Sequence, residues 1–144
     1  MSEPDGDQTN IWASGRAYEP YVGRWSRLVA REFLTWLNIP PGKRWLDVGS
    51  GTGALSQTIL QTSDPGAVVG VDRSEGFAAY AEAQTQDERA EFRVGDAQDL
   101  PVDDGTFDAA VSGFVLNFIP QPMRAVEEMA RAVVPGGTVA VYVW

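Results

Sequence analysis

Three glycines stand at alternate positions directly behind a short apolar run. Gly49, Gly51 and Gly53 follow the residues WLDV, and glycines spaced in this way let the backbone approach a ligand closely. Gly49, Gly51 and Ala54 meet the G-x-G-x-x-A pattern of dinucleotide-binding loops. Asp72 follows after about 20 residues, where such proteins carry an acid that binds a ribose. The loop by itself therefore leaves a nicotinamide or flavin nucleotide open as its ligand.

An aspartate beside this loop changes the interpretation. Asp47 precedes the first glycine by two residues, where its charge opposes a phosphate and attracts a cation. Gly53 removes a third side chain, so the loop can lie flat against a bulky group. An acidic, glycine-lined crevice favours a ligand with an amino group, a positive centre and a ribose. S-adenosylmethionine has all three.

Carboxylates also stand at the ends of two later strand patterns. Asp72 follows the apolar run AVVGV, and Asp96 follows EFRV after one glycine. The carboxyl ends of parallel strands meet at one edge of a sheet, where ligands bind. Asp47, Asp72 and Asp96 are therefore expected around one crevice.

The composition excludes several kinds of chemistry. The 144 residues include no cysteine and no histidine, which excludes disulfides, a thiol nucleophile and a Ser-His-Asp triad, and no metal site is expected. The net charge of −9 repels phosphate backbones and anionic lipids, so neither nucleic acid nor a membrane is an expected partner. The amino terminus is polar and acidic, unlike a signal peptide, and the expected location is the cytoplasm.

The pattern along the chain predicts strands and helices in alternation, as in βαβ units with a parallel sheet. Residues 1–16 are expected to be flexible, and residues 17–144 to form one domain. The expected helices are 21–39, 53–61, 74–86 and 121–133, and the expected strands are 44–48, 67–71, 91–94, 107–113 and 138–144.

The expected core comes from the apolar positions of these elements. In the first helix, residues at spacings of three and four form one apolar face, Leu28, Val29, Phe33, Trp36 and Leu37. The residues predicted to be buried are Phe33, Trp36, Leu37, Leu46, Val48, Val69, Val71, Val111, Met129 and Val133.

Four segments in order carry a resemblance to a known family. LDVGSGTGAL, GVDRSEG, GDAQDLPVDDGTFDAAV and VLNFIPQPMRAVEEMARAVVPGG together resemble the class I S-adenosylmethionine-dependent methyltransferases of the type 11 group, which includes the ubiquinone and menaquinone C-methyltransferases. The match runs from Trp45 to the last residue. It implies an α/β fold with a Rossmann-like, doubly wound parallel sheet in the order 3-2-1-4-5, without strands 6 and 7 of that family.

The resemblance also implies roles for individual residues. Asp47 matches the acid that holds the methionine amino group, Asp72 the acid that accepts both ribose hydroxyls, and Asp96 with Ala97 the pair that reads adenine. Each also has a structural explanation, as a loop anchor, a helix cap or a turn residue. The residues expected to bind the cofactor are Arg24, Asp47, Gly49, Ser50, Gly51, Gly53, Asp72, Arg73, Asp96, Ala97, Gln98 and Ser112.

No catalytic residue can be assigned from the sequence. Many relatives carry histidines where this chain has Asn117 and Phe118. If the acceptor must lose a proton, the candidates for the base are Tyr18, Tyr21 or a bound water. The expected function is methyl transfer to a small-molecule acceptor. The alternatives are a non-catalytic fragment that binds S-adenosylmethionine and an NAD(P)-dependent oxidoreductase.

The absence of strands 6 and 7 predicts an incomplete sheet. The last strand, 138–144, is apolar on both faces and lies at the sheet edge in the expected order. Self-association through this edge, or poor order near Tyr142 to Trp144, is therefore expected.

Overall fold

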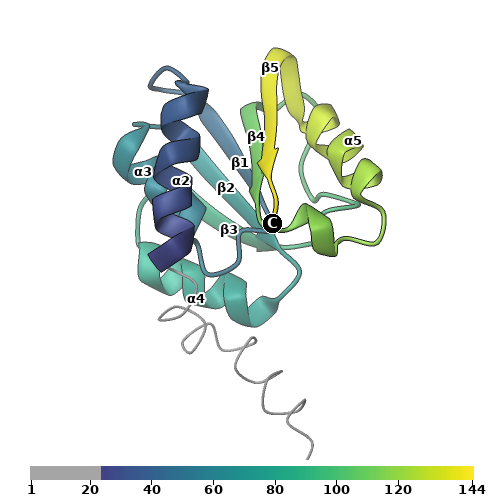
Figure 1. The fold of residues 1–144 in the computed structure, drawn as a ribbon, viewed down its shortest axis with the longest axis horizontal. Coiled ribbons are helices and arrows are strands. Elements are labelled where there is room, and N and C mark those ends of the chain that lie inside the picture. The colour runs from purple at the N-terminus through teal and green to yellow at the C-terminus, as the bar shows by residue number, and fades with distance from the viewer. Residues whose placement is uncertain (1–23) are drawn as a thin grey trace, which may run out of the picture.

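The computed structural model describes residues 24–144, so the expected flexible segment 1–16, Tyr18, Tyr21 and the predicted helix start at residue 21 lie outside the described residues. The described chain forms one sheet of five parallel strands with helices on both faces (Figure 1). The strands are β1 (Arg44–Val48), β2 (Ala67–Asp72), β3 (Ala90–Val94), β4 (Phe107–Gly113) and β5 (Val133–Tyr142), and the helices are α2 (Arg24–Leu37), α3 (Ala54–Thr62), α4 (Glu75–Thr85), the 3-10 turn η2 (Leu116–Phe118) and α5 (Pro122–Ala132).

The strand order is β3-β2-β1-β4-β5, with every neighbouring pair parallel, which confirms the predicted fold class. The first strand is central, and its register places Asp47 between Gly70 of β2 and Val111 of β4. The carboxyl ends of β1, β2 and β4 therefore meet at one edge, where the glycine loop begins.

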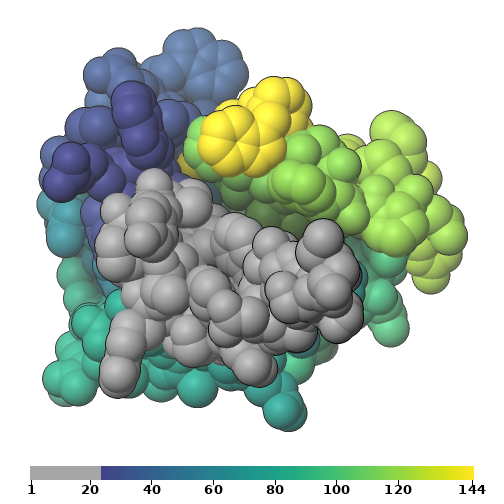
Figure 2. Space-filling view, turned by 60° about the horizontal axis from the view of Figure 1, so that its bottom comes forward, coloured from purple at the N-terminus to yellow at the C-terminus, as the bar shows by residue number. Residues whose placement is uncertain are grey.

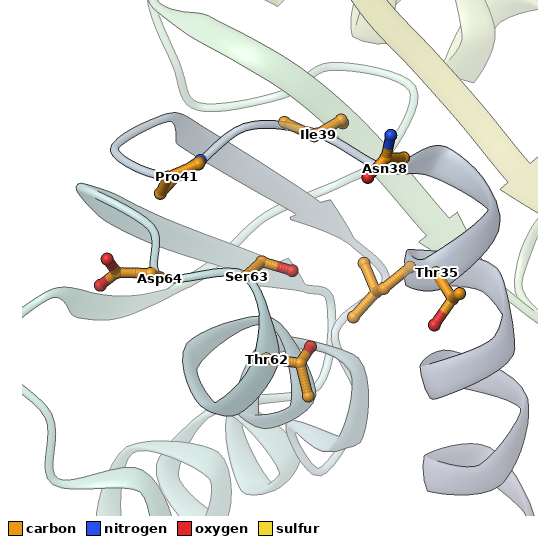
Figure 3. A pocket seen from close by; sticks show the side chains of 8 residues that line it. Thr35, Asn38, Ile39, Pro41, Thr62, Ser63 and Asp64 are labelled. Atoms are coloured by element: carbon orange, nitrogen blue, oxygen red, sulfur yellow. The ribbon is translucent and has the colours of Figure 1, made fainter.

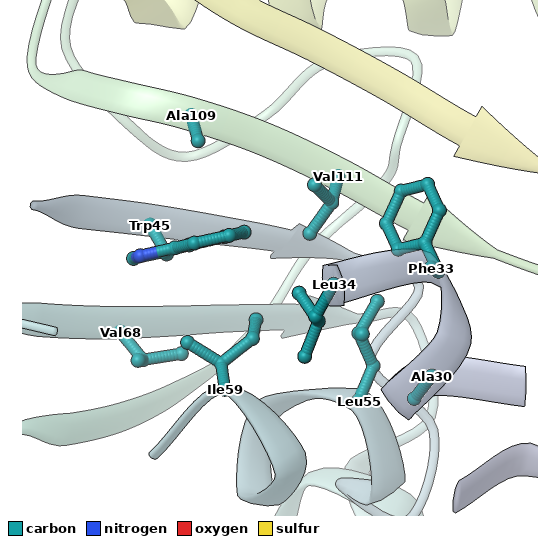
Figure 4. Close-up of a cluster of buried hydrophobic side chains, with 9 residues drawn as sticks. All are labelled: Ala30, Phe33, Leu34, Trp45, Leu55, Ile59, Val68, Ala109 and Val111. Carbon is teal, nitrogen blue, oxygen red and sulfur yellow. The ribbon is translucent and has the colours of Figure 1, made fainter. Parts of the chain in front are cut away.

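Two hydrophobic clusters fill the two faces of the sheet. On one face, α2 and α3 pack over β1, β2 and β4, and the indole of Trp45 lies between Ala109 and Val68 (Figure 4). Its buried members are Ala30, Phe33, Leu34, Trp45, Leu55, Ile59, Val68, Ala109 and Val111. The other face packs against α5 and the crossover loop through Leu46, Val48, Val69, Val71, Leu100, Phe107, Ala110, Met129 and Ala132.

The buried face of α2 differs from the predicted one. Ala30 and Leu34 point into the core with Phe33, whereas Trp36 is 75% exposed and Leu28 is 49% exposed. The prediction for Trp36 is wrong because α2 carries two adjacent apolar stripes, and periodicity does not decide which one faces the sheet. Because Ala30 is small, α2 can approach the sheet closely. Packing against α3 then places the stripe with Ala30, Phe33 and Leu34 in the core.

Helix ends largely follow local signals. Ser74 caps α4, since its Oγ accepts a hydrogen bond from the Phe77 amide at 3.2 Å. Thr52 is not the cap of α3, because Gly53 takes that position in a left-handed conformation.

The last strand begins earlier than predicted. It pairs with β4 from Val133 onward, and a register shift between Phe107 and Ala109 absorbs the segment Pro135 to Gly137. The prediction of a strand at 138–144 missed this bulge, because Pro-Gly-Gly signals a turn when strand pairing is not considered.

The crossover from β3 to β4 contains no helix and is attached to α5 instead. The Glu128 carboxylate accepts from the Leu100 amide at 2.8 Å, and the Arg131 guanidinium donates to Glu128 and to the Leu100 carbonyl. Leu100 itself is buried. This network holds the loop that carries Asp96 and Ala97 against the sheet.

Candidate cofactor site

The glycine loop between β1 and α3 is folded back onto the end of β2. The amides of Gly49 and Ser50 both donate to the Val71 carbonyl, at 2.7 and 3.1 Å, and the Gly53 amide donates to the Ser50 carbonyl at 2.9 Å. The Gly51 amide donates to Asp72 Oδ1 at 3.0 Å. Four amides of the loop are therefore already engaged within the protein.

Asp72 is anchored at the end of β2 by both of its carboxylate oxygens. Oδ1 accepts from the Gly51 amide, and Oδ2 accepts from the Ser74 amide at 2.9 Å. Burial raises the pKa of this carboxyl, and the two amides oppose that rise. Because each carboxylate oxygen has two acceptor positions, one position on each remains for a ligand with two neighbouring hydroxyls.

Two hollows meet at Gly49, Asp72 and Val115. We call them the tyrosine hollow and the aspartate hollow. The tyrosine hollow is lined by Ser26, Gly49, Ser50, Gly51, Thr52, Ala54, Leu55, Asp72, Phe77, Gly113, Phe114, Val115 and Tyr142. The aspartate hollow is lined by Gly49, Val71, Asp72, Arg73, Asp96, Ala97, Gln98, Val115, Ile119 and Pro120. Together they form an elongated site along the carboxyl edge of the sheet.

Asp96 and Gln98 form the outer end of the aspartate hollow. Asp96 Oδ1 accepts from the Gln98 amide at 2.8 Å, and this bond is the main reason that the pKa of Asp96 is lowered. The Gln98 side-chain oxygen accepts from the Gln121 amide at 3.0 Å. The Gln98 amide thus holds the exposed Asp96 carboxylate, and Gln98 is itself bonded to Gln121, which precedes α5.

The structure places eight of the twelve predicted cofactor residues on these hollows and four away from them. Those on the hollows are Gly49, Ser50, Gly51, Asp72, Arg73, Asp96, Ala97 and Gln98. Arg24 is exposed at the first position of α2, and Gly53 is buried at the cap of α3. Ser112 is buried, and its Oγ donates to the Val48 carbonyl at 2.8 Å.

Asp47 lies behind the loop rather than in its wall. The side chain is buried, and its Oδ2 accepts from Ser56 Oγ at 2.7 Å. Burial raises the pKa of Asp47 to about 7, the Ser56 hydrogen bond opposes the rise, and the charge of Asp72 adds to it. Asp47 is therefore a buried carboxyl behind the loop, with a pKa of about 7, and its side chain lines neither hollow.

This raised pKa predicts a pH-dependent stability. In the folded chain the pKa of Asp47 is about 7, whereas in the unfolded chain it is near 3.8. The folded chain therefore keeps this proton to a higher pH. The free energy of unfolding should therefore fall as the pH rises from about 4 to about 7 through this group, by an amount on the order of a few kcal/mol. The neutral variant Asp47→Asn lacks this contribution.

Urea denaturation of the wild type and of Asp47→Asn across pH 4–8 measures the effect. The stability of the variant relative to the wild type should increase steadily with pH across that window. Parallel curves for the two proteins would show that Asp47 titrates normally in the folded chain.

The site also contains residues that sequence reasoning missed. Ser26 of α2, Phe77 of α4 and the pair Phe114 and Val115 after β4 all line it, as does Tyr142 of β5. Alternation along the last strand places Tyr142 on the α2 side with Ala140, and that signal could have indicated an inward side chain. Asn117 and Phe118, in contrast, are exposed on η2 and line neither hollow.

A separate hollow opens at the opposite edge of the sheet (Figure 3). It lies between the ends of α2 and α3 and the turn before β1, and Asn38, Ser63 and Asp64 are among its lining residues. Ligands of parallel sheets bind at the carboxyl ends of the strands, so this hollow is not the candidate site. Within residues 24–144, no group of three or more acidic residues is placed to hold a metal ion, and no helix is long and apolar enough to cross a membrane.

Comparisons with known proteins agree with this architecture. The family model described as "Methyltransferase domain" matches residues 46–141. Demethylmenaquinone methyltransferase from Bacillus licheniformis is 36% identical over 105 residues, covering 72% of this chain and 45% of that protein. The chain thus spans about half the length of the curated relatives that it matches.

Solved structures show the same fold. The methyltransferase in complex with the Haloferax volcanii Trm112 methyltransferase activator has a TM-score of 0.86 at 28% identity, covering 92% of this chain and 58% of that one. The cyclase SpnF has a TM-score of 0.69 at 31% identity, covering 88% and 47%. The chain belongs to the methyltransferase domain family, with the fold of the class I S-adenosylmethionine-dependent methyltransferases.

Proposed function

We propose that this chain binds S-adenosylmethionine along the two hollows and serves methyl transfer to a small-molecule acceptor. The observation that carries the proposal is Asp72, which both hollows share. Its carboxylate is held rigidly by two backbone amides and keeps an open acceptor position on each oxygen. Two such positions, side by side, suit the neighbouring hydroxyls of a ribose.

The surroundings of Asp72 fit the rest of the cofactor. The aspartate hollow offers the Asp96 carboxylate and the backbone of Ala97 to the adenine, and the tyrosine hollow remains for the methionine part. Ser50 lines the tyrosine hollow, and its buried Oγ has no hydrogen-bond partner among the described residues. An orphaned hydroxyl at this position supports a polar ligand here.

The carboxylates beside the glycine loop, Asp47 and Asp72, argue against a dinucleotide. A pyrophosphate binds free N–H groups at the start of a helix. In this loop, the amides of Gly49, Ser50, Gly51 and Gly53 already donate to protein oxygens, and two carboxylates lie close by. A ligand with a positive centre suits that environment better than one with two negative charges.

The protein's own contribution to the reaction is positioning and exclusion of water. S-adenosylmethionine supplies an activated methyl group on a sulfonium when it is bound. Leu55, Phe77, Phe114 and Val115 give the tyrosine hollow an apolar wall, which shields a reacting pair from solvent and limits its orientations. A reaction in which the cofactor supplies the activated group and the protein supplies positioning needs no histidine or cysteine, and this chain has neither.

The acceptor is proposed from the relatives. Relatives that match over about half of their length include demethylmenaquinone methyltransferases, and this favours a planar quinone-type ring as the acceptor class. A second candidate is a protein that keeps the cofactor site but transfers no methyl group. That candidate is favoured by SpnF, a cyclase that is 31% identical to this chain.

Calorimetry with S-adenosylhomocysteine and with NAD tests the cofactor. Binding of the homocysteine product is expected, with a stabilisation of about 2.7 kcal/mol at a ligand concentration of about 100 times Kd. Asp72→Ala should weaken that binding by about 1–3 kcal/mol, because two hydroxyls lose their partner. Asp99→Ala is the matched control, since Asp99 is an exposed aspartate that lines neither hollow.

Two results would contradict the proposal. Binding of NAD without binding of S-adenosylhomocysteine would favour the oxidoreductase. Equal affinities of the Asp72→Ala and Asp99→Ala variants would reduce Asp72 to an anchor of the loop.

A further inference from the structure

The hydroxyl of Tyr142 is a polar group in the site, and it forms no hydrogen bond that stabilises the described fold. Tyr142 is the last residue of β5 and pairs with Gly113 at the end of β4. Its side chain lines the tyrosine hollow. The hydroxyl makes no hydrogen bond within residues 24–144, although many of the side chains around it are apolar.

The Tyr142 ring is held rigidly from two sides. The Phe33 ring lies 4.6 Å from it, centroid to centroid, and the Phe114 ring lies 4.8 Å away at an interplanar angle of 90°. The Phe114 amide also donates to the Tyr142 carbonyl at 2.8 Å. A ring clamped in this way presents its hydroxyl at a defined point with little loss of entropy on binding.

The glycine at position 113 makes room for this hydroxyl. A Cβ atom built on Gly113 would lie 2.4 Å from both the Cζ and the hydroxyl oxygen of Tyr142. Any larger residue at position 113 would therefore displace the phenol. The phenol thus lies against the backbone at the end of β4, next to the end of β1.

Among residues 24–144, no cationic side chain lines the tyrosine hollow. No lysine or arginine stands among its described lining residues, and Arg24 is not among them either. The side-chain donors among its described lining residues include the hydroxyls of Ser26, Ser50 and Tyr142. Burial and the nearby charge of Asp47 raise the pKa of Tyr142, so the phenol stays a proton donor at neutral and moderately alkaline pH.

We propose that the Tyr142 hydroxyl donates a hydrogen bond to the carboxylate at the amino-acid end of the cofactor. This inference rests on the proposed function. The aspartate hollow takes the adenosine, so the amino acid is left to the tyrosine hollow, where the Tyr142 hydroxyl offers a donor for the carboxylate. Tyr142 is a positioning residue in this arrangement, because it orients the cofactor without touching the bond that breaks.

A comparison of two ligands tests the contribution of the amino-acid end to binding. S-adenosylhomocysteine carries the amino acid, whereas 5′-methylthioadenosine has the same adenosine and a thioether without it. The variant Tyr142→Phe keeps the ring between Phe33 and Phe114 and removes only the hydroxyl. Calorimetry should show a Kd for S-adenosylhomocysteine that rises about tenfold, as for a lost hydrogen bond to a charged group, and a Kd for 5′-methylthioadenosine that stays within about twofold.

Two further variants keep the test independent of folding. Tyr80→Phe is the matched control, because Tyr80 is a half-buried tyrosine of α4 that lines neither hollow, and it should change neither Kd. Gly113→Ala retains the hydroxyl but displaces it, and it should reproduce the selective loss seen with Tyr142→Phe.

The outcomes distinguish this inference from the proposed function. If Tyr142→Phe binds S-adenosylhomocysteine as tightly as the wild type, or loses both ligands equally, the assignment of Tyr142 is wrong while the cofactor site stands. If the wild type binds neither ligand, the proposed function fails, and the inference fails with it.

Discussion

Replacing Trp45 with alanine is expected to lower the free energy of unfolding by about 3–5 kcal/mol, as for other fully buried aromatic residues. Trp45 is 1% exposed and belongs to the cluster between the sheet and helices α2 and α3 (Figure 4). Its removal leaves a cavity between these elements. Urea denaturation, followed by circular dichroism, measures the loss.

Trp36→Ala is the matched control for this prediction. Trp36 belongs to the stripe of α2 that faces away from the core and is 75% exposed, so its loss should change the stability by about 0.5 kcal/mol or less. A loss for Trp36→Ala as large as that for Trp45→Ala would mean that α2 packs through its other face. The pair of tryptophans therefore tests the orientation of the helix.

The second large effect is expected at Gly49. This residue has φ +73°, and a Cβ atom there would lie 2.6 Å from both γ-carbons of Val115. Gly49→Ala should lower the free energy of unfolding by about 1–3 kcal/mol through this overlap, in addition to the cost of a left-handed backbone. Since Gly49 and Val115 border both hollows, the variant should also lose most of its affinity for S-adenosylhomocysteine.

The variant Gly105→Ala separates the cost of a left-handed backbone from the cost of the overlap with Val115. Gly105 has φ +57°, but no atom lies within 4 Å of a Cβ built on it, and it lines neither hollow. This control should lose about 1–2 kcal/mol of stability and keep its affinity. The double variant with Val115→Ala should recover part of the loss at Gly49, because two of the three close contacts disappear. An unchanged affinity in Gly49→Ala would show that the junction of the hollows is not where the cofactor lies.

The strand β5 lies at the edge of the sheet, where self-association is expected. Val139 and Val141 are each more than a third exposed, and the C-terminal residues lie at the surface (Figure 2). Tyr142 and Phe114 nevertheless pack together, and Phe114 stacks on Trp144 with ring centroids 4.2 Å apart. Pairing of β5 with a second copy of the chain remains a proposal, which light scattering can test.

The sequence by itself determined the order of the elements, their arrangement in βαβ units and the glycine loop. These features depend on signals close together in the chain. The alternation of strands and helices implies right-handed crossovers, Ser74 caps its own helix, and Asp72 ends its own strand. The strand order, in contrast, followed only from the resemblance of four consecutive motifs to a known family, and it agrees with the structure.

Only the tertiary structure decided which side chains reach the site. Asp47 lies behind the loop because Ser56 of α3 and the neighbouring strands enclose it, and Trp36 is exposed because α3 selects the other stripe of α2. Tyr142 enters the site because β5 pairs with β4 and places it against Gly113. Periodicity and capping act over a few residues, whereas the direction of a side chain into a crevice depends on the register and packing of segments far apart in the chain.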